Sequence, residues 1–120
     1  KLAEIATKIE VGYLLLWRTA EMLDRDQDPN VESSALKVVS TELARDMAEV
    51  AMEILGPYGQ LTEESEWSPI RAMVSRGFLE SISATIGAGT SEIQRNIIGE
   101  RALNLPREPA VEPKTDRREG

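Results

Sequence analysis

The sequence predicts an all-α domain, an antiparallel four-helix bundle, and three observations favour that fold. Apolar side chains recur at steps of three and four residues in four separate segments of the 120-residue chain, which is the period of an amphipathic helix. No segment shows the two-residue alternation that is typical of a strand. The connections between the segments are polar or carry Gly and Pro, and short connections place consecutive helices side by side in opposite directions.

The first predicted helix covers residues 2–25 and carries an apolar stripe along its length. Around its middle, Tyr13, Leu14 and Trp17 add apolar groups to the other faces, so we expect this section to be buried on more than one side. Gly12 costs about 1 kcal/mol relative to Ala inside a helix, which indicates either a tolerated glycine or the close approach of a second backbone or a ligand. The stripe consists of Leu2, Ile5, Ile9, Gly12, Leu16, Thr19 and Leu23.

The second predicted helix covers residues 31–55 and has well-marked boundaries. Asn30 is expected to cap its start, and Gly56 followed by Pro57 is expected to stop it. Carboxylates follow one face of this helix at steps of four and three, a pattern that is usually a solvated face rather than a binding site. This acidic strip consists of Glu42, Asp46, Glu49 and Glu53.

Two shorter helices are predicted in the second half of the chain. The third has Ser68 as its cap and Pro69 as its first residue, and runs to about residue 84. The loop before it holds three Glu residues whose spacing is a weak match to any cation site, so no metal is expected. The fourth helix is predicted over residues 92–104. Its inward-facing residues are expected to be Ile93, Ile97 and Ala102.

Residues 85–90, which we call the elbow, join the last two predicted helices. Gly87 and Gly89 free the backbone to turn sharply, and Ser91 begins an S-x-x-Q capping box, so Ser91 is the expected N-cap. The unpaired N–H groups of the first helical turn can hold a phosphate, a carbonyl oxygen or a carboxylate. The elbow is therefore the best candidate site, unless it only connects two helices.

Composition excludes several classes of function. The net charge is −7 and no basic cluster precedes the C-terminal tail, so nucleic acid is not an expected partner. Without Cys or His, the chain has no disulfide, thiolate nucleophile, Cys/His metal site or Ser-His-Asp triad. No apolar run reaches the length of a membrane span and no signal sequence is visible, so we expect a cytoplasmic protein.

The two ends of the chain carry expectations of their own. The helical pattern of apolar residues already includes Leu2, which indicates that the chain is part of a longer protein. The helical domain is expected to end at residue 105. The polar, Pro-rich tail of residues 106–120 is expected to be disordered or to lie along a partner.

The stretch after residue 85 resembles the closing motif of the acyl-CoA dehydrogenase family. The matching residues, 86–108, read I-G-A-G-T-S-E-I-Q-R-N-I-I-G-E-R-A-L-N-L-P-R-E. Upstream, L-A-E-I-A-T-K-I-E, R-T-A-E-M-L-D, Lys37 and A-M-E-I-L-G-P-Y-G stand in the order of that family's C-terminal helical domain. The resemblance covers about residues 1–107.

The resemblance implies an FAD-dependent oxidoreductase that converts an acyl-CoA thioester to the 2,3-enoyl-CoA in fatty-acid or sterol side-chain breakdown. A carboxylate removes the α-proton while the β-hydrogen leaves as hydride to the flavin. The resemblance also implies preceding domains that complete the active site, so that this part alone is inactive. The implied partners are the acyl-CoA, further copies of the chain or a homologous subunit in a dimer or tetramer, and the electron-transfer flavoprotein.

The same resemblance assigns the substrate thioester to the elbow. The backbone N–H of Ala88, beside Gly89, would polarise the thioester oxygen and stabilise the enolate-like charge. Many members carry the catalytic Glu where this chain has Ala88, and others carry it where this chain has Gly87, so no catalytic residue is identified. In some branches of the family, which carry a small residue at the elbow, the base lies on the first helix of this domain, upstream of or near where this chain begins. Alternatively the base lies on another type of subunit, or the protein is a homologue such as a flavin-dependent hydroxylase.

For FAD, the resemblance implies contacts at two places. The positions are Thr90, Ser91 and Glu92 after the elbow, and Glu53 and Gly56 in a loop that approaches the flavin nucleotide of a neighbouring subunit. That loop reads E-I-L-G-P-Y-G where the family has Q-I-x-G-G-x-G, so Pro57 removes a backbone donor and Glu53 adds a charge that repels pyrophosphate. Arg95 and Arg101 match family arginines, or simply pair with nearby carboxylates.

The sequence thus leaves a leading and a rival hypothesis. The leading one is the C-terminal domain of a flavin-dependent acyl-CoA dehydrogenase. The rival is a non-catalytic subunit or helical assembly domain that keeps the fold without the base, which the residues Ala88, Pro57 and Glu53 favour.

Overall fold

The computed structural model describes residues 1–107, and within this range every regular element is helical. The all-α prediction is therefore confirmed. The elements are α1 (Leu2–Asp24), α2 (Asn30–Leu55), the 3-10 turns η1 (Gly56–Gln60) and η2 (Pro69–Ala72), α3 (Met73–Ala84) and α4 (Ser91–Ala102). The predicted tail lies almost entirely outside the described residues.

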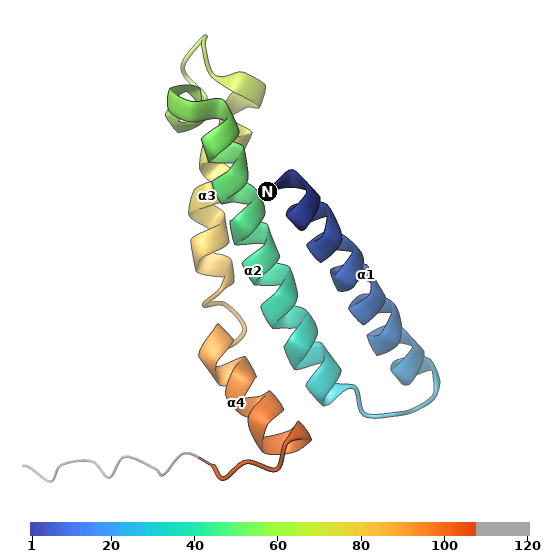
Figure 1. The fold of residues 1–120 in the computed structure, drawn as a ribbon. Coiled ribbons are helices and arrows are strands. Elements are labelled where there is room, and N and C mark those ends of the chain that lie inside the picture. The colour runs from blue at the N-terminus through green and yellow to red at the C-terminus, as the bar shows by residue number, and fades with distance from the viewer. Residues whose placement is uncertain (108–120) are drawn as a thin grey trace, which may run out of the picture.

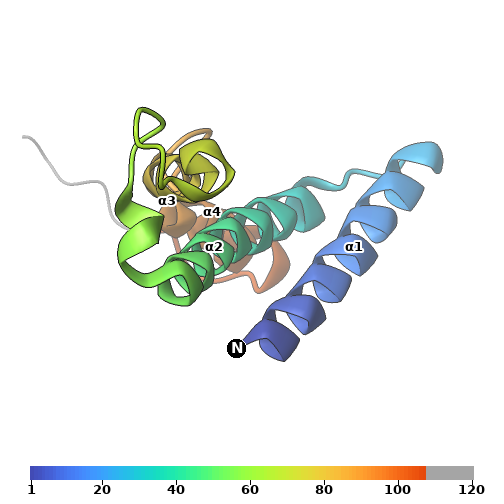
Figure 2. The ribbon, with the colours of Figure 1, turned by 90° about the horizontal axis from the view of Figure 1, so that it is seen from above.

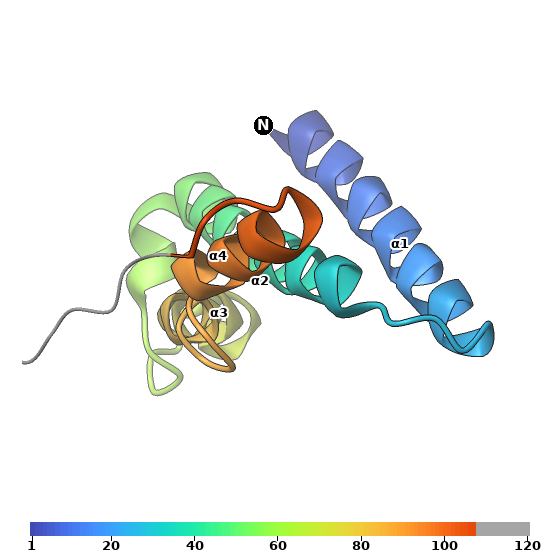
Figure 3. The same cartoon turned by 90° about the horizontal axis from the view of Figure 1, so that it is seen from below.

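Helix α2 is the centre of the domain. Helices α1, α3 and α4 all pack against α2, and within residues 1–107 α1 packs against neither α3 nor α4. Figure 1 shows α3 and α4 following each other along one side of α2, with α1 on the other side, and all three run antiparallel to α2. The views from above and below show the same order (Figures 2 and 3). The antiparallel neighbours are as predicted, and the bundle they form is open.

The core of the described domain is thin. Its buried apolar residues are Val38 and Ala72, and the buried residue of α1 is Thr19. Tyr13, Leu14 and Trp17 on α1 are 56%, 69% and 71% exposed. The prediction that the middle of α1 is buried on several sides is wrong for residues 1–107, because among them α2 alone packs on α1 and covers a single face.

The predicted end of α2 is confirmed, whereas the predicted cap at its start is wrong. Gly56 ends the helix with a φ of 54°, in the left-handed region that glycine adopts without strain. At the other end, Asn30 is the first helical residue and not the cap. Its backbone N–H donates to Oδ1 of Asp28 at 3.1 Å, so a side chain two residues earlier already satisfies this amide.

Helix α3 begins four residues later than predicted. Ile70, Arg71 and Ala72 have φ values of 45°, 52° and 55°, which interrupt the helix expected after Pro69. Ser68 is extended and its side chain caps no amide. The hydroxyl of Ser75 lies 3.2 Å from the carbonyl oxygen of Leu61 and 3.0 Å from that of Ala72. This contact ties the irregular turn to the preceding loop.

Helix α4 turns a different face toward α2 than predicted. Ser91 is buried, and Ile97 and Ile98 are half-buried, whereas Ile93 is 51% exposed and Ala102 is exposed. The inward prediction is right for Ile97 and wrong for the other two residues. The packed face starts from Ser91, the predicted cap, which in the structure is already the first residue of the helix.

No helix among residues 1–107 is both long enough and apolar enough to cross a membrane. The same residues contain no group of acidic side chains arranged to hold a metal ion.

Candidate functional site

The elbow is a true bend between two helices. The N–H groups of Ile86 and Gly87 both donate to the carbonyl of Ser83 at 3.0 Å, which closes α3. Ala88 and Gly89 then take φ values of 55° and 91°, so the chain leaves the helical path. The φ of Gly89 favours glycine at this position, and a Cβ there would lie 2.9 Å from Nε2 of Gln94 and displace the end of that side chain.

Thr90, and not Ser91, caps α4. The Thr90 side-chain oxygen accepts the backbone N–H of Ile93 at 3.3 Å. The predicted capping box was therefore placed one residue too far along the chain. The Gln94 side chain donates from Nε2 to the carbonyl oxygen of Ala88 at 3.0 Å instead of returning to a cap residue. This bond holds the outer peptide of the elbow against the first turn of α4.

Ser91 is instead packed inward. Its residue is 7% exposed, and its Oγ has no hydrogen-bond partner among the described residues. A buried hydroxyl without a partner costs free energy. Ser91 also lines the pocket described below, although its Oγ atom is itself buried.

Glu92 lies in the first turn of α4, and its carboxylate folds back onto that turn. Hydrogen bonds from its own backbone N–H and from the Thr90 hydroxyl hold the pKa of Glu92 below its ordinary value, with smaller contributions from Arg95 and Lys37. Glu92 is therefore ionised at neutral pH, and its negative charge sits at the positive end of the helix dipole.

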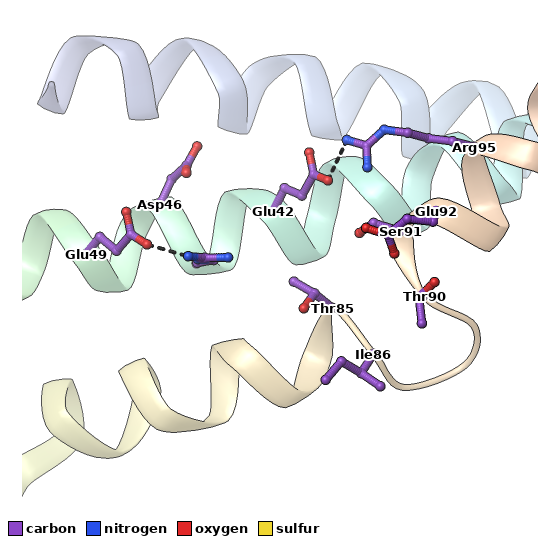
Figure 4. A pocket seen from close by; sticks show the side chains of 10 residues that line it. Glu42, Asp46, Glu49, Thr85, Ile86, Thr90, Ser91, Glu92 and Arg95 are labelled. Carbon is purple, nitrogen blue, oxygen red and sulfur yellow. Dashed lines mark hydrogen bonds and ion pairs between the residues drawn. The ribbon is translucent and has the colours of Figure 1, made fainter.

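A pocket of about 520 Å³ lies between the elbow, the start of α4 and α2 (Figure 4). Four carboxylates and two guanidinium groups line it, so its charge balance is negative. The lining residues are Glu42, Arg45, Asp46, Glu49, Thr85, Ile86, Thr90, Ser91, Glu92 and Arg95. The structure thus brings the predicted residues Thr90, Ser91 and Glu92 together on one wall.

The acidic strip of α2 is more than a solvated face, because each carboxylate has a basic partner. Glu42 pairs with Arg95 of α4 at 2.6 Å, and Glu53 pairs with Lys1 at 2.6 Å. Asp46 pairs with Lys8 of α1, whose pKa is raised by that bond and charge, and Glu49 pairs with Arg45. Three of the four pairs therefore join α2 to a neighbouring segment. The prediction that Arg95 pairs with a carboxylate is confirmed.

The other predicted cofactor residues lie elsewhere. Glu53 and Gly56 lie at the C-terminal end of α2 and do not line the pocket; they follow Glu49, the last α2 residue that does, by four and seven residues, or about 6 and 10 Å at ~1.5 Å per residue. The structure therefore does not bring them into the elbow pocket. The Glu53 carboxylate is held by Lys1, and Gly56 forms the helix stop with open space around it.

Ala88 offers its backbone N–H at the bend. Within residues 1–107 this N–H has no hydrogen-bond acceptor, while the Ala88 carbonyl is engaged by Gln94. Neither Ala88 nor Gly87 carries a side-chain base. The described part of the elbow can therefore donate to an oxygen but has no group that accepts a carbon-bound proton.

Lys37 is a residue of this site to which sequence reasoning gave no role. Its Nζ donates to the backbone carbonyl of Thr85 at 3.1 Å, across 48 positions of sequence. The one local signal was a lysine in the otherwise apolar run A-L-K-V-V.

Comparison with known proteins identifies the family. The family description "Acyl-CoA dehydrogenase, C-terminal domain" matches residues 1–103. The chain belongs to the acyl-CoA dehydrogenase family. Acyl-CoA dehydrogenase FadE26 of Mycobacterium tuberculosis is 38% identical over 109 residues, which cover 88% of this chain and 27% of that protein.

Solved acyl-CoA dehydrogenase structures share the fold. The ChsE4-ChsE5 complex from Mycobacterium tuberculosis matches with a TM-score of 0.79 and 37% identity, over 89% of this chain and 28% of that one. The Tcur3481-Tcur3483 steroid ACAD matches with a TM-score of 0.82 and 26% identity, over 89% and 28%. The chain thus corresponds to roughly a quarter of the length of these acyl-CoA dehydrogenases.

Proposed function

We propose that this chain is the C-terminal part of a flavin-dependent dehydrogenase that oxidises an acyl-CoA thioester to the 2,3-enoyl-CoA, and that the elbow receives the thioester carbonyl. The observation that carries this proposal is the free N–H of Ala88 in a left-handed bend beside the N-terminus of α4. A backbone donor fixed at that point stabilises negative charge on the thioester oxygen when the α-proton leaves.

The residues after the elbow fit an uncharged edge of FAD better than its phosphates. Thr90 and Ser91 are uncharged hydroxyl residues; the Thr90 hydroxyl is engaged by Ile93 and Glu92, whereas the buried Ser91 hydroxyl lacks a partner among the described residues. The carboxylates that line the pocket repel a pyrophosphate. When bound, FAD supplies the hydride acceptor, and the chain's own residues orient the cofactor and the thioester.

The substrate proposal is an acyl-CoA from fatty-acid or sterol side-chain breakdown, and the sterol class is favoured. Its support is the similarity to a complex named as a steroid ACAD. For the rest of the molecule, we propose a cytoplasmic protein that assembles as a dimer or tetramer and passes electrons to the electron-transfer flavoprotein.

Because the elbow carries no catalytic base, the proposal has two forms, which differ in where the base lies. In the first, an upstream helix of the same protein carries the carboxylate. In the second, a homologous subunit carries it and this chain is a non-catalytic subunit. Two of the similar structures contain two differently named chains, which favours testing the second form directly. The paired or self-capped carboxylates of the elbow pocket favour neither Glu92 nor the acidic strip as the base.

The test is to place a carboxylate at the elbow of the intact protein. If a base already acts from elsewhere, Ala88→Glu crowds the site and lowers kcat/KM by at least tenfold. If the site lacks a base, Ala88→Glu raises the activity of a subunit assayed alone. Ala88→Gln is the matched control, because it has nearly the same size and accepts no proton. Equal activity of both variants and the wild type would contradict the placement of the thioester at the elbow.

A further inference from the structure

Two side chains of α2 contact the residues on either side of the elbow. Lys37 donates from Nζ to the Thr85 carbonyl at 3.1 Å, on the α3 side of the bend. Glu42, five residues further along the same helix, accepts from Arg95 at 2.6 Å, on the α4 side. The two contacts therefore bracket residues 86–94, and one rigid helix provides both.

The two contacts differ in kind. The Glu42–Arg95 pair is exposed, with side chains 42% and 54% accessible, so solvent screens it. Lys37 is half-buried, and its partner is a backbone carbonyl that has left the helical ladder of α3. A cation at the C-terminal end of a helix is favoured by the dipole. Lys37 is thus the better fixed of the two contacts.

The peptide between Thr85 and Ile86 is bonded on both sides: its N–H donates to Ser83 within the chain's own turn, and its carbonyl accepts from Lys37 of α2. The preceding carbonyls are satisfied locally, because Ile82 accepts the Thr85 hydroxyl at 2.8 Å and Ser83 accepts the N–H groups of Ile86 and Gly87. The Thr85 peptide comes three residues before Ala88, in a segment that contains Gly87. The Lys37 contact thus ties this peptide to α2, two residues before the peptide that carries the free Ala88 N–H.

We propose that Lys37 is a positioning residue for the Ala88 N–H: by holding the Thr85 carbonyl, it fixes the direction in which the elbow donates. This inference rests on the proposed function for its catalytic consequence, and on geometry alone for its structural one. Lys37 touches neither thioester nor flavin in this proposal. It acts through the backbone between Thr85 and Ala88. A donor displaced by even about 1 Å loses much of its effect on the reacting oxygen.

The test compares Lys37→Met, Lys37→Arg and Arg18→Met in the intact, flavin-loaded protein. Methionine keeps the apolar stem and removes the charge, and arginine keeps a cation. Arg18 is the matched control, because it is a cation that bonds Glu32 between α1 and α2, and α1 contacts neither α3 nor α4 in the described residues. The structural readout is amide hydrogen exchange of residues 86–92. The catalytic readouts are kcat and KM.

We expect Lys37→Met to raise exchange in residues 86–92 at least tenfold and to lower kcat about tenfold, a change worth about 1.4 kcal/mol in the barrier, with KM within twofold. Lys37→Arg should recover part of both effects, and Arg18→Met should change neither. Unchanged exchange in Lys37→Met overturns the proposal, as does raised exchange with an unchanged kcat. An inactive wild type contradicts the proposed function instead. In that case the exchange measurement alone decides whether Lys37 holds the elbow.

Discussion

Two adjacent hydroxyl residues, Thr90 and Ser91, have opposite roles in the domain. Thr90 caps α4, whereas Ser91 is buried with an unpaired Oγ. Both residue types favour helix starts, so local sequence alone does not separate them. Packing against α2 separates them, because it draws Ser91 inside. The sequence could therefore predict that a cap exists at this point but could not assign it to one residue.

The two roles predict different effects of alanine substitution on the stability of the domain. Thr90→Ala should destabilise the domain by about 1 kcal/mol, because the Ile93 amide loses its acceptor. Ser91→Ala should be neutral or slightly stabilising without ligand, because it removes an unpaired buried hydroxyl. Urea denaturation of the two variants beside the wild type measures both effects. The reverse order of stabilities would show that Ser91 is the cap.

The lowered pKa of Glu92 predicts that the stability of the folded domain falls at acidic pH. Its pKa is lower in the folded protein than its ordinary value of 4.5, so the stabilisation it gives is present above that pH and is lost as pH falls through the folded pKa. Glu92→Gln should therefore lower the melting temperature at neutral pH and make little difference well below the folded pKa. Glu10→Gln, at an exposed position on α1, is the matched control. A constant difference between Glu92→Gln and wild type across this range would contradict the assigned role.

Among the elements, the helix boundaries show what sequence can and cannot predict. The stop at Gly56 and Pro57 follows from backbone chemistry and is confirmed. The interruption at residues 70–72 has no such signal, because Ser68 and Pro69 form a good helix start. The pairs that join α2 to Lys1, Lys8 and Arg95 link positions 38 to 53 apart in sequence. Residue patterns within one helix hold no information about such partners.

The interrupted start of α3 predicts how a glycine substitution changes stability. The sign of that change distinguishes the observed backbone from a regular helical turn. Arg71 has a φ of 52°, a conformation that costs an L-residue about 1–2 kcal/mol and costs glycine little. Arg71→Gly should therefore stabilise the domain by up to about 1 kcal/mol. If residues 69–72 were a regular helical turn, the same change would destabilise it by a similar amount. Thermal denaturation of Arg71→Gly beside Arg71→Ala distinguishes the two cases.

For the whole molecule, the exposed side of α1 is the largest discrepancy between sequence and structure. Its apolar residues fit burial on several sides, yet α2 covers one face of the helix. Gly12 has nothing within 4 Å of an added Cβ, so its small size is not required by contacts with the part of the chain that the structure describes. Both observations are expected if another part of the assembled protein packs on α1.

This leads to a prediction about assembly. In the intact protein, Trp17→Glu should reduce the oligomer to smaller species, because it places a charge in an apolar contact. Sedimentation velocity measures the change. Glu66→Lys, in the loop before η2, is the control and should leave the assembly unchanged. An unaltered oligomer in Trp17→Glu would show that this face of α1 is not an interface between subunits.

The central claim is that the elbow serves an acyl-CoA dehydrogenation with a bound flavin. The most direct measurement is an anaerobic titration of the intact protein, with its homologous subunit where one is needed, using an acyl-CoA. The account predicts that the visible absorbance of oxidised flavin is bleached and that one 2,3-enoyl-CoA forms per flavin. A folded protein that holds no flavin, or a flavin that no acyl-CoA reduces, would contradict it.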